Sequence, residues 1–264
     1  GNSIINMYAK CGDLKNAFTV FDMMLERNVT TWNTIISVCN HRNCIKDCLQ
    51  LFQQMQLECV MLNELTYIII LSVCNSSSAL LTGREMHARL VSSGFERNIA
   101  IGTSLISMYN SCSDLKSARA VFDAIPAHNV ISWNAIITGY VELGHAEEAL
   151  SRYEQMQHEG VLPNAIAYIC ILKACCRIGA LEKGKRVHAQ VSGVNLHDKN
   201  TILGTTLVDM YAKCGALGKA QEIFDELEIH NVITWNVLIT GYAQKGHAEE
   251  TLYCLEWMQL EGFL

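Results

Sequence analysis

Proline and long apolar runs are both scarce in this sequence. Only Pro126 and Pro163 occur among 264 residues, and half of the residues are apolar, a composition that suits a chain made mostly of helices. The longest apolar runs lie around Tyr67–Cys74 and Ala165–Leu172, far below the roughly 18 residues that a membrane-spanning helix needs. Neither a charged-then-apolar leader nor an Arg- and Ser-rich transit segment stands at the first residues. We therefore expect no membrane as a partner.

Paired spacings of the kind used for metal sites or disulfide frameworks are also missing, although the chain holds twelve cysteines. No Cys-x-x-Cys pair occurs. Cys11, Cys112 and Cys214 occupy matching places in similar segments, and Cys74 is likewise equivalent to Cys175. This periodic placement predicts free, buried thiols in a reducing compartment and no metal site.

Catalytic motifs are missing as well, since the chain contains no nucleophile elbow, phosphate loop or zinc-hydrolase segment. The histidines recur at equivalent places, in the pairs His87 and His188, His128 and His230, and His145 and His247. A residue that recurs once per repeat is expected to pack or to cap a helix rather than to catalyse. We therefore predict that this chain is not an enzyme and that it uses no cofactor and no small-molecule substrate.

The segment Val130–Asn164 has the pattern of an antiparallel helical hairpin. Trp133, Ile137 and Tyr140 are spaced by four and three residues, so they share one face of a first helix. A second helix is expected from about His145, with its own apolar stripe and with acidic residues in its first turn. Two helices this short cannot bury both apolar faces alone, so the hairpin needs neighbours.

The hairpin recurs along the whole chain. The dipeptide Trp-Asn begins at Trp32, Trp133 and Trp235, and these spacings of 101 and 102 residues correspond to three hairpins each. The predicted units are 1–28, 29–63, 64–98, 99–129, 130–164, 165–200, 201–231 and 232–264, with the first and last incomplete. Within each period two units of 35 or 36 residues precede one of 31. The sequence therefore predicts an all-α solenoid of helical hairpins that is truncated at both ends.

These alternating lengths resemble those of plant pentatricopeptide repeat proteins of the PLS subclass. Further points of resemblance are the Tyr-Ala-Lys-Cys-Gly segments that begin at Tyr8 and Tyr211, and the Trp-Asn dipeptide early in a long unit. The units 29–63, 130–164 and 232–264 match the P type, 64–98 and 165–200 the L type, and 1–28, 99–129 and 201–231 the S type. A tetratricopeptide array would keep a constant unit of about 34 residues. The resemblance implies a right-handed superhelix that binds single-stranded RNA, one base per repeat.

In that family the fifth and last residues of a unit face the base edge. The base-reading residues that the resemblance implies are Asn2, Asn28, Asn33, Asn63, Thr103, Asn129, Asn134, Asn164, Thr205, Asn231 and Asn236. Asn with Asn implies a pyrimidine, with cytosine favoured over uracil, and Thr with Asn implies adenine. Ile68 and Ile169 hold the fifth place in the L units and have no hydrogen bond to offer. With units running 5′ to 3′, the implied footprint is 5′-YYNAYNAY-3′.

A structural interpretation of the last position stays open. Every complete unit ends in Asn, including Asn98 and Asn200, and Asn is also a good N-cap residue for the helix that follows. The fifth position is harder to explain by structure, because Asn has poor propensity early in a helix.

The second residues of neighbouring units sandwich the base in the family. This implies stacking roles for Thr30, Ala100, Ile131, Ile202 and Ile233. The isoleucines cover more of a base face than Thr30 and Ala100, and stacking a base is worth about 1–3 kcal/mol. We therefore expect a firmer grip in the second half of the chain.

Charge argues against a nonspecific nucleic-acid binder, because the net charge is −6. Lys10, Lys173, Arg177 and Lys213 could line a groove, but the middle S unit has Ser111 in place of the lysine. Binding should therefore be modest and only mildly dependent on salt.

Two functions follow from these residues and from the resemblance. The first is recognition of single-stranded RNA within an organellar RNA-editing factor of mitochondrion or plastid, with editing-complex proteins as further partners. The alternative is a protein-binding helical scaffold without RNA contact. The family's deaminase-like domain carries a Pro-Cys-x-x-Cys segment that this chain lacks, so that any editing chemistry would lie outside the chain or on a partner.

Overall fold

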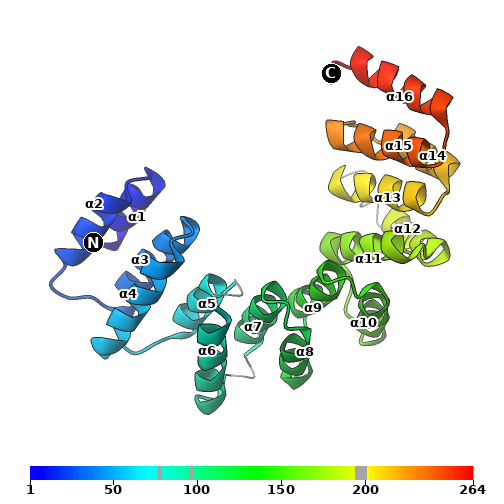
Figure 1. Ribbon diagram of the computed structural model, residues 1–264. Helices are drawn as coiled ribbons and strands as arrows, with labels where there is room; N and C mark the ends of the chain where they lie inside the picture. Colours follow the sequence, from blue (N-terminus) through cyan, green and yellow to red (C-terminus); the bar gives the residue numbers. More distant parts are fainter. Residues whose placement is uncertain (76–78, 96–97, 194–200, 264) are drawn as a thin grey trace. The chain divides into compact units, whose positions relative to one another are not determined.

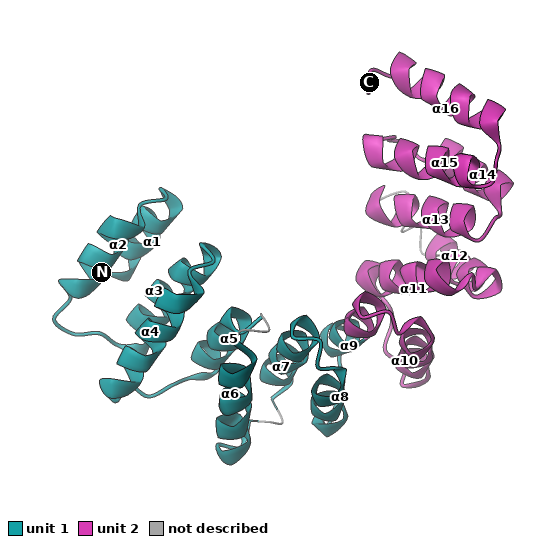
Figure 2. Cartoon of the chain, in the orientation of Figure 1, with its two compact units in different colours: residues 1–136 teal, residues 137–264 magenta. Residues whose placement is uncertain are grey.

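The computed structural model describes residues 1–75, 79–95, 98–193 and 201–263, and over these ranges every regular element is an α-helix. The chain forms two compact units, Gly1–Ile136 and Ile137–Leu264 (Figure 2). The prediction of an all-α fold is therefore confirmed for the described residues. None of the helices described is long and apolar enough to cross a membrane.

The first unit holds four helical hairpins and the start of a fifth (Figure 1). Its helices are α1 (Asn2–Lys10), α2 (Leu14–Asp22), α3 (Val29–His41), α4 (Ile45–Leu57), α5 (Glu64–Val73), α6 (Leu80–Ser92), α7 (Ile99–Ser111) and α8 (Leu115–Ala124). The next helix, α9 (Val130–Glu142), begins in the first unit and ends in the second. The second unit contains α10 (Ala146–His158), α11 (Ala165–Ile178), α12 (Leu181–Gly193), α13 (Thr201–Lys213), α14 (Leu217–Glu226), α15 (Val232–Gln244) and α16 (Ala248–Leu260).

The first helices of successive hairpins pack against one another. In the first unit α1 contacts α3, α3 contacts α5 and α5 contacts α7, and in the second unit α11 contacts α13 and α13 contacts α15. From α3 to α15 these first helices begin at Val29, Glu64, Ile99, Val130, Ala165, Thr201 and Val232, the residues at which the division of the sequence starts its units. The assignment of the units to P, L and S types stays a prediction. Asn200, the predicted last residue of unit 165–200, lies outside the described residues.

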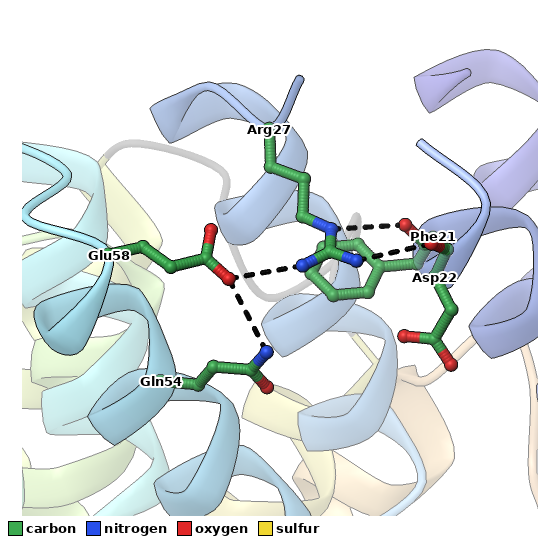
Figure 3. A network of polar contacts seen from close by, with 5 residues as sticks. All are labelled: Phe21, Asp22, Arg27, Gln54 and Glu58. Carbon is green, nitrogen blue, oxygen red and sulfur yellow. Dashed lines mark hydrogen bonds and ion pairs between the residues drawn. The ribbon is translucent and has the colours of Figure 1, made fainter. Parts of the chain in front are cut away.

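The units 1–28, 99–129 and 201–231 are each joined to the following unit by an aromatic cluster. Phe21 on α2 meets Trp32 on α3 edge to face, with ring centroids 4.8 Å apart. Arg27 lies between them in the chain, and its guanidinium sits 4.7 Å from the Phe21 ring centroid. The same guanidinium donates to the Phe21 and Asp22 carbonyls and to Glu58, at 3.1–3.2 Å (Figure 3). Arg27 therefore ties α2, α3 and the end of α4 together.

Histidine takes the place of Arg27 at the other two junctions. His128 stacks on Phe122 with centroids 4.0 Å apart, and its Nε2 lies 3.0 Å from the Phe122 carbonyl oxygen. His230 repeats this arrangement on Phe224, at 4.2 Å and 2.9 Å. The remaining paired histidines also make structural contacts, since His87 and His188 bond to tyrosine hydroxyls and His145 and His247 occupy N-cap positions. The predicted packing role is therefore confirmed for four of these histidines, whereas His145 and His247 make no side-chain bond to the helix backbone and contact Glu148 and Glu250 instead.

Cysteine thiols in two hairpins contact backbone carbonyl oxygens of cysteines in the preceding hairpin. The Cys112 thiol lies 3.5 Å from the Cys74 carbonyl oxygen, and Cys214 lies 3.9 Å from that of Cys175. All twelve cysteines are free, but Cys11 and Cys59 are exposed, so the prediction of burial is wrong for these two. Burial raises the pKa of Cys74 to about 12 and that of Cys175 to about 11, so both thiols stay protonated near neutral pH. The described residues contain no cluster that could hold a metal ion.

The close approach of α15 to α13 at Gly241 allows the packing of these two helices to be tested. A Cβ added at Gly241 on α15 would lie 2.7 Å from the Cβ of Ala212 on α13, so Gly241→Ala must push two helices apart. We expect this variant to lower the free energy of unfolding by about 1–3 kcal/mol in urea denaturation.

Gly218→Ala on α14 is the matched control, because nothing lies within 4 Å of its added Cβ. Its better helix propensity should leave stability unchanged or raise it by up to about 1 kcal/mol. Equal destabilisation by both variants would contradict the close packing of α13 on α15.

Candidate nucleic-acid interface

The second residue of each first helix from α3 to α15 is exposed, although the third and fourth residues of the same helix are buried. Ile131, Ile202 and Ile233 are 61%, 68% and 66% exposed, and the smaller Thr30 and Ala100 are exposed as well. Leu65 and Ile166, 53% and 54% exposed, hold the same place in the L units. They were missed as stacking candidates, although counting two residues into each L unit would have found them. An exposed aliphatic side chain at this repeated place makes no contribution to the core and is available to cover a flat ligand.

One predicted base-reading pair is in direct contact. Asn33 Nδ2 on α3 donates a hydrogen bond of 3.1 Å to the Oδ1 of Asn63, the last residue of the same unit. Asn33 is only 3% exposed, whereas Asn63 is exposed. The hydroxyl of the buried Thr66, three residues beyond Asn63, donates to Asn33 Oδ1 at 2.9 Å. Asn33, at the fifth position of its unit, is thus hydrogen-bonded both to Asn63 at the last position of that unit and to Thr66 on α5.

The threonine readers are arranged differently from each other. Thr205 donates to the Thr201 carbonyl oxygen at 2.8 Å and lies 3.0 Å from the hydroxyl of Thr234, which in turn donates to Asn231. Thr103 donates to the Ile99 carbonyl oxygen at 2.7 Å and makes no hydrogen bond to Asn129. Thr205 therefore reaches its predicted partner Asn231 only through Thr234.

The other residues predicted at the fifth position range from buried to exposed. Asn2 has a buried Oδ1 without a hydrogen-bond partner, and it is not bonded to the exposed Asn28. On α9, Asn134 is 8% exposed. Asn236 on α15 is exposed. Of the two L-unit fifth residues, both Ile68 and Ile169 are partly buried.

Every last residue that the structure describes caps the helix that follows it. The side-chain Oδ1 accepts a backbone N–H of that helix at 2.9–3.1 Å, in Asn28, Asn63, Asn98, Asn129, Asn164 and Asn231. The N-cap interpretation that the sequence left open is therefore confirmed. Because a backbone N–H can only donate, the capping atom must be the oxygen, which orients each amide and leaves its NH₂ group for other partners.

A crevice of about 300 Å³ opens between α13 and α15, a size at the lower end of ligand sites. It is lined by the second and fifth residues of unit 232–264, Ile233 and Asn236, together with Asp209, Ala212, Lys213, Val237, Thr240, Gly241 and Gln244. A crevice of about 380 Å³ between α1 and α3 is lined at equivalent places by Asn6, Ala9, Lys10, Ser37, Val38, His41 and Arg42. Each crevice lies between the first helix of a predicted S unit and the first helix of the unit that follows it.

The two crevices differ in their positive charge. Lys213 Nζ lies 2.7 Å from Asp209 Oδ2, which offsets its charge, and Arg177 donates to the Val141 carbonyl oxygen. Cys176 lies 3.8 Å from the same Asp209 carboxylate, and burial, with that charge, raises its pKa to about 12. Lys10 and Arg42 line the α1–α3 crevice, and Lys173 is exposed on α11. The lysine of the α13–α15 crevice is therefore paired with a carboxylate, whereas none of the described residues that line the α1–α3 crevice carries a carboxylate.

Comparison with known proteins gives consistent matches. The model described as "PPR repeat family" matches residues 27–76 and 128–177, and the model "PPR repeat" matches 2–29, 205–232 and 233–263. A chloroplastic pentatricopeptide repeat-containing protein of Arabidopsis thaliana is 37% identical over 263 residues, which cover 100% of this chain and 42% of that protein. A mitochondrial one from the same plant is 36% identical over 264 residues, covering 99% and 41%. The chain thus spans about two fifths of the length of these relatives.

Solved structures show the same fold. The crystal structure of the pentatricopeptide repeat protein PPR10 in complex with an 18-nt psaJ RNA element superimposes with a TM-score of 0.80 at 17% identity, covering 100% of this chain and 40% of that one. PPR10 from maize in a further crystal structure gives a TM-score of 0.81 at 16% identity, covering 99% and 38%. The fold is accordingly an α-solenoid of helical hairpins.

Substitutions of Asn129 can test its capping role separately from its predicted base-reading role. Asn129 Oδ1 accepts the backbone N–H groups of Ile131 and Ser132 at 3.0 and 2.9 Å. Asn129→Ala should lower the free energy of unfolding by about 1 kcal/mol, because these N–H groups lose their partner. Asn129→Asp should keep the wild-type value, since a carboxylate caps equally well and interacts favourably with the helix dipole. Chemical denaturation measures both, and equal losses in the two variants would contradict the capping role.

Proposed function

Because this chain belongs to the pentatricopeptide repeat family, we propose that it binds single-stranded RNA, one base per repeat, along the exposed face of its first helices. The observation that carries the proposal is the repeated pairing of an exposed second residue with polar fifth and last residues. Ile233 and Asn236 line one crevice, where an aliphatic group and an amide can meet the face and the edge of a base. PPR10, whose fold this chain shares, is a protein whose crystal structure holds an RNA element.

The finer proposal concerns subclass and sequence. We assign the repeats to the PLS pattern, with the footprint 5′-YYNAYNAY-3′ read by the Asn and Thr pairs. The repeats serve as the recognition part of an organellar RNA-editing factor, and the editing chemistry lies on a domain outside this chain or on a partner protein. The names of the similar Arabidopsis proteins, chloroplastic and mitochondrial, support an organelle as the compartment.

The modest positive charge supports a sequence-dependent mode of binding. With a net charge of −6 and with Lys213 paired to Asp209, general attraction to phosphates contributes little. Affinity then depends on stacking and on base-edge hydrogen bonds, so a mismatched base removes a large share of it.

Fluorescence anisotropy tests the proposal with two RNAs, 5′-CCUACUAC-3′ and 5′-CCUGCUGC-3′. We expect the wild type to prefer the first, with each adenine contributing about tenfold. Asn129→Asp, which keeps the cap of α9, should shift the preference at the fourth base from adenine to guanine.

A protein that binds both RNAs equally, before and after the substitution, would contradict the base-reading proposal. Absence of binding to either RNA would favour the protein-binding scaffold instead. Because Asn129→Asp is expected to fold as stably as the wild type, neither outcome can be attributed to loss of structure.

A further inference from the structure

We infer that the buried hydroxyl at the third residue of a repeat, represented by Thr66, is a specificity-determining position, because it fixes which hydrogen-bonding groups the preceding unit presents to its base. This inference rests on the proposed RNA-binding function and deepens it. Thr66 is fully buried on α5, so its own side chain is not part of the exposed face, but it bonds to Asn33 and to the exposed Asn63. It acts through Asn33 and Asn63, and is therefore a positioning residue.

The hydrogen bonds around Thr66 determine the orientation of both amides. The Thr66 backbone N–H donates to Asn63 Oδ1 at 3.0 Å, and Asn33 Nδ2 donates to the same oxygen at 3.1 Å. The Thr66 hydroxyl lies 2.9 Å from the Oδ1 atoms of both Asn33 and Asn63. Since Asn63 Oδ1 already accepts two N–H groups and a hydroxyl has one proton, the Thr66 hydroxyl donates to Asn33 Oδ1.

Both amide oxygens of the pair are consequently occupied inside the protein. Both N–H groups of the exposed Asn63 are free of these bonds, whereas Asn33 is only 3% exposed and its oxygen bonds to the buried Thr66, so that the pair presents mainly donors to the exposed face. Cytosine has two adjacent acceptors, N3 and O2, on its Watson–Crick edge, whereas uracil has a donor at N3. A pair that presents mainly donors therefore favours cytosine, and this preference depends on the Thr66 hydroxyl holding Asn33 Oδ1 away from the base.

A similar arrangement occurs at Thr234, although there the hydroxyl proton goes to the last residue rather than to the fifth, and the arrangement is missing at another cap. Thr234, also fully buried, lies 3.0 Å from both Thr205 Oγ1 and Asn231 Oδ1, the fifth and last residues of unit 201–231. Thr31 donates to Asn28 Oδ1 at 3.1 Å but does not contact Asn2, the corresponding fifth residue. Thr31 thus shares the capping role of Thr66 without its link to a fifth residue.

Thr66→Val tests the inference, because it keeps the shape of the side chain and removes the hydroxyl. Binding of 5′-CCUACUAC-3′ is compared with that of 5′-CUUACUAC-3′, which differs only at the second base, the one assigned to unit 29–63. We expect the wild type to favour cytosine by about fivefold to tenfold, the effect of one hydrogen bond, and Thr66→Val to lose that preference. Thr66→Ser, which restores a hydroxyl, should restore the preference.

Thr31→Val is the matched control. It removes the hydroxyl contact of another cap, so thermal unfolding should register a similar small loss in both valine variants, yet the cytosine preference at the second base should persist. A Thr66→Val protein that keeps the wild-type preference would overturn the inference, as would a wild type without preference at this base. Failure of the wild type to bind either RNA would instead overturn the proposed function.

Discussion

The hydrogen bond from the backbone of a helix to the Asn that precedes it is the interaction on which the rest of this structure depends. It recurs at each of the six last residues that the structure describes, at 2.9–3.1 Å. Each bond caps the N-terminus of the first helix of a hairpin. The first helices of successive hairpins pack against one another within each of the two compact units. The bond also holds the amide oxygen inward and leaves the NH₂ group of the same Asn for a base. One side chain can therefore serve helix capping and recognition together, because the two roles use different atoms.

The junctions that follow units 1–28, 99–129 and 201–231 share an edge-to-face contact between Phe and Trp but differ in the third residue of the cluster. Arg27, His128 and His230 each sit against a phenylalanine and reach its backbone carbonyl, and they hold the second helix of an S unit to the Trp-containing helix that follows. This cluster lies in the buried seam, away from the exposed second residues. The aromatic clusters are thus separate from the exposed second residues, whereas helix capping and the proposed base reading share the same Asn side chains.

Periodicity alone was sufficient for the helices and for their order, because Trp133, Ile137 and Tyr140 stand at helical spacing within one unit and the unit recurs along the chain. The family resemblance, applied to these unit boundaries, also placed Asn33 and Asn63 in one site, and the hydrogen bond between them agrees with this. The link through Thr66 could not be predicted, because residues 33 apart meet only when two hairpins are packed. Similar limits hold for Thr103, which bonds its own helix rather than Asn129, and for the near-complete burial of Asn33. Hydrogen-bond direction depends on tertiary contacts that a repeat pattern does not encode.

We propose that the helix cap and the third-residue hydroxyl together present hydrogen-bond donors to the base. A titration of the wild type with 5′-CCUACUAC-3′ carrying 3-deazacytidine at the second base tests it most directly, since this base has a C–H in place of the N3 acceptor and is otherwise cytosine. We expect binding to weaken by about fivefold to tenfold, to the level of the uracil-containing RNA, because one donor of the pair loses its acceptor. Binding as tight as that of the cytosine RNA would contradict the account, because the pair would then recognise some other feature of the base.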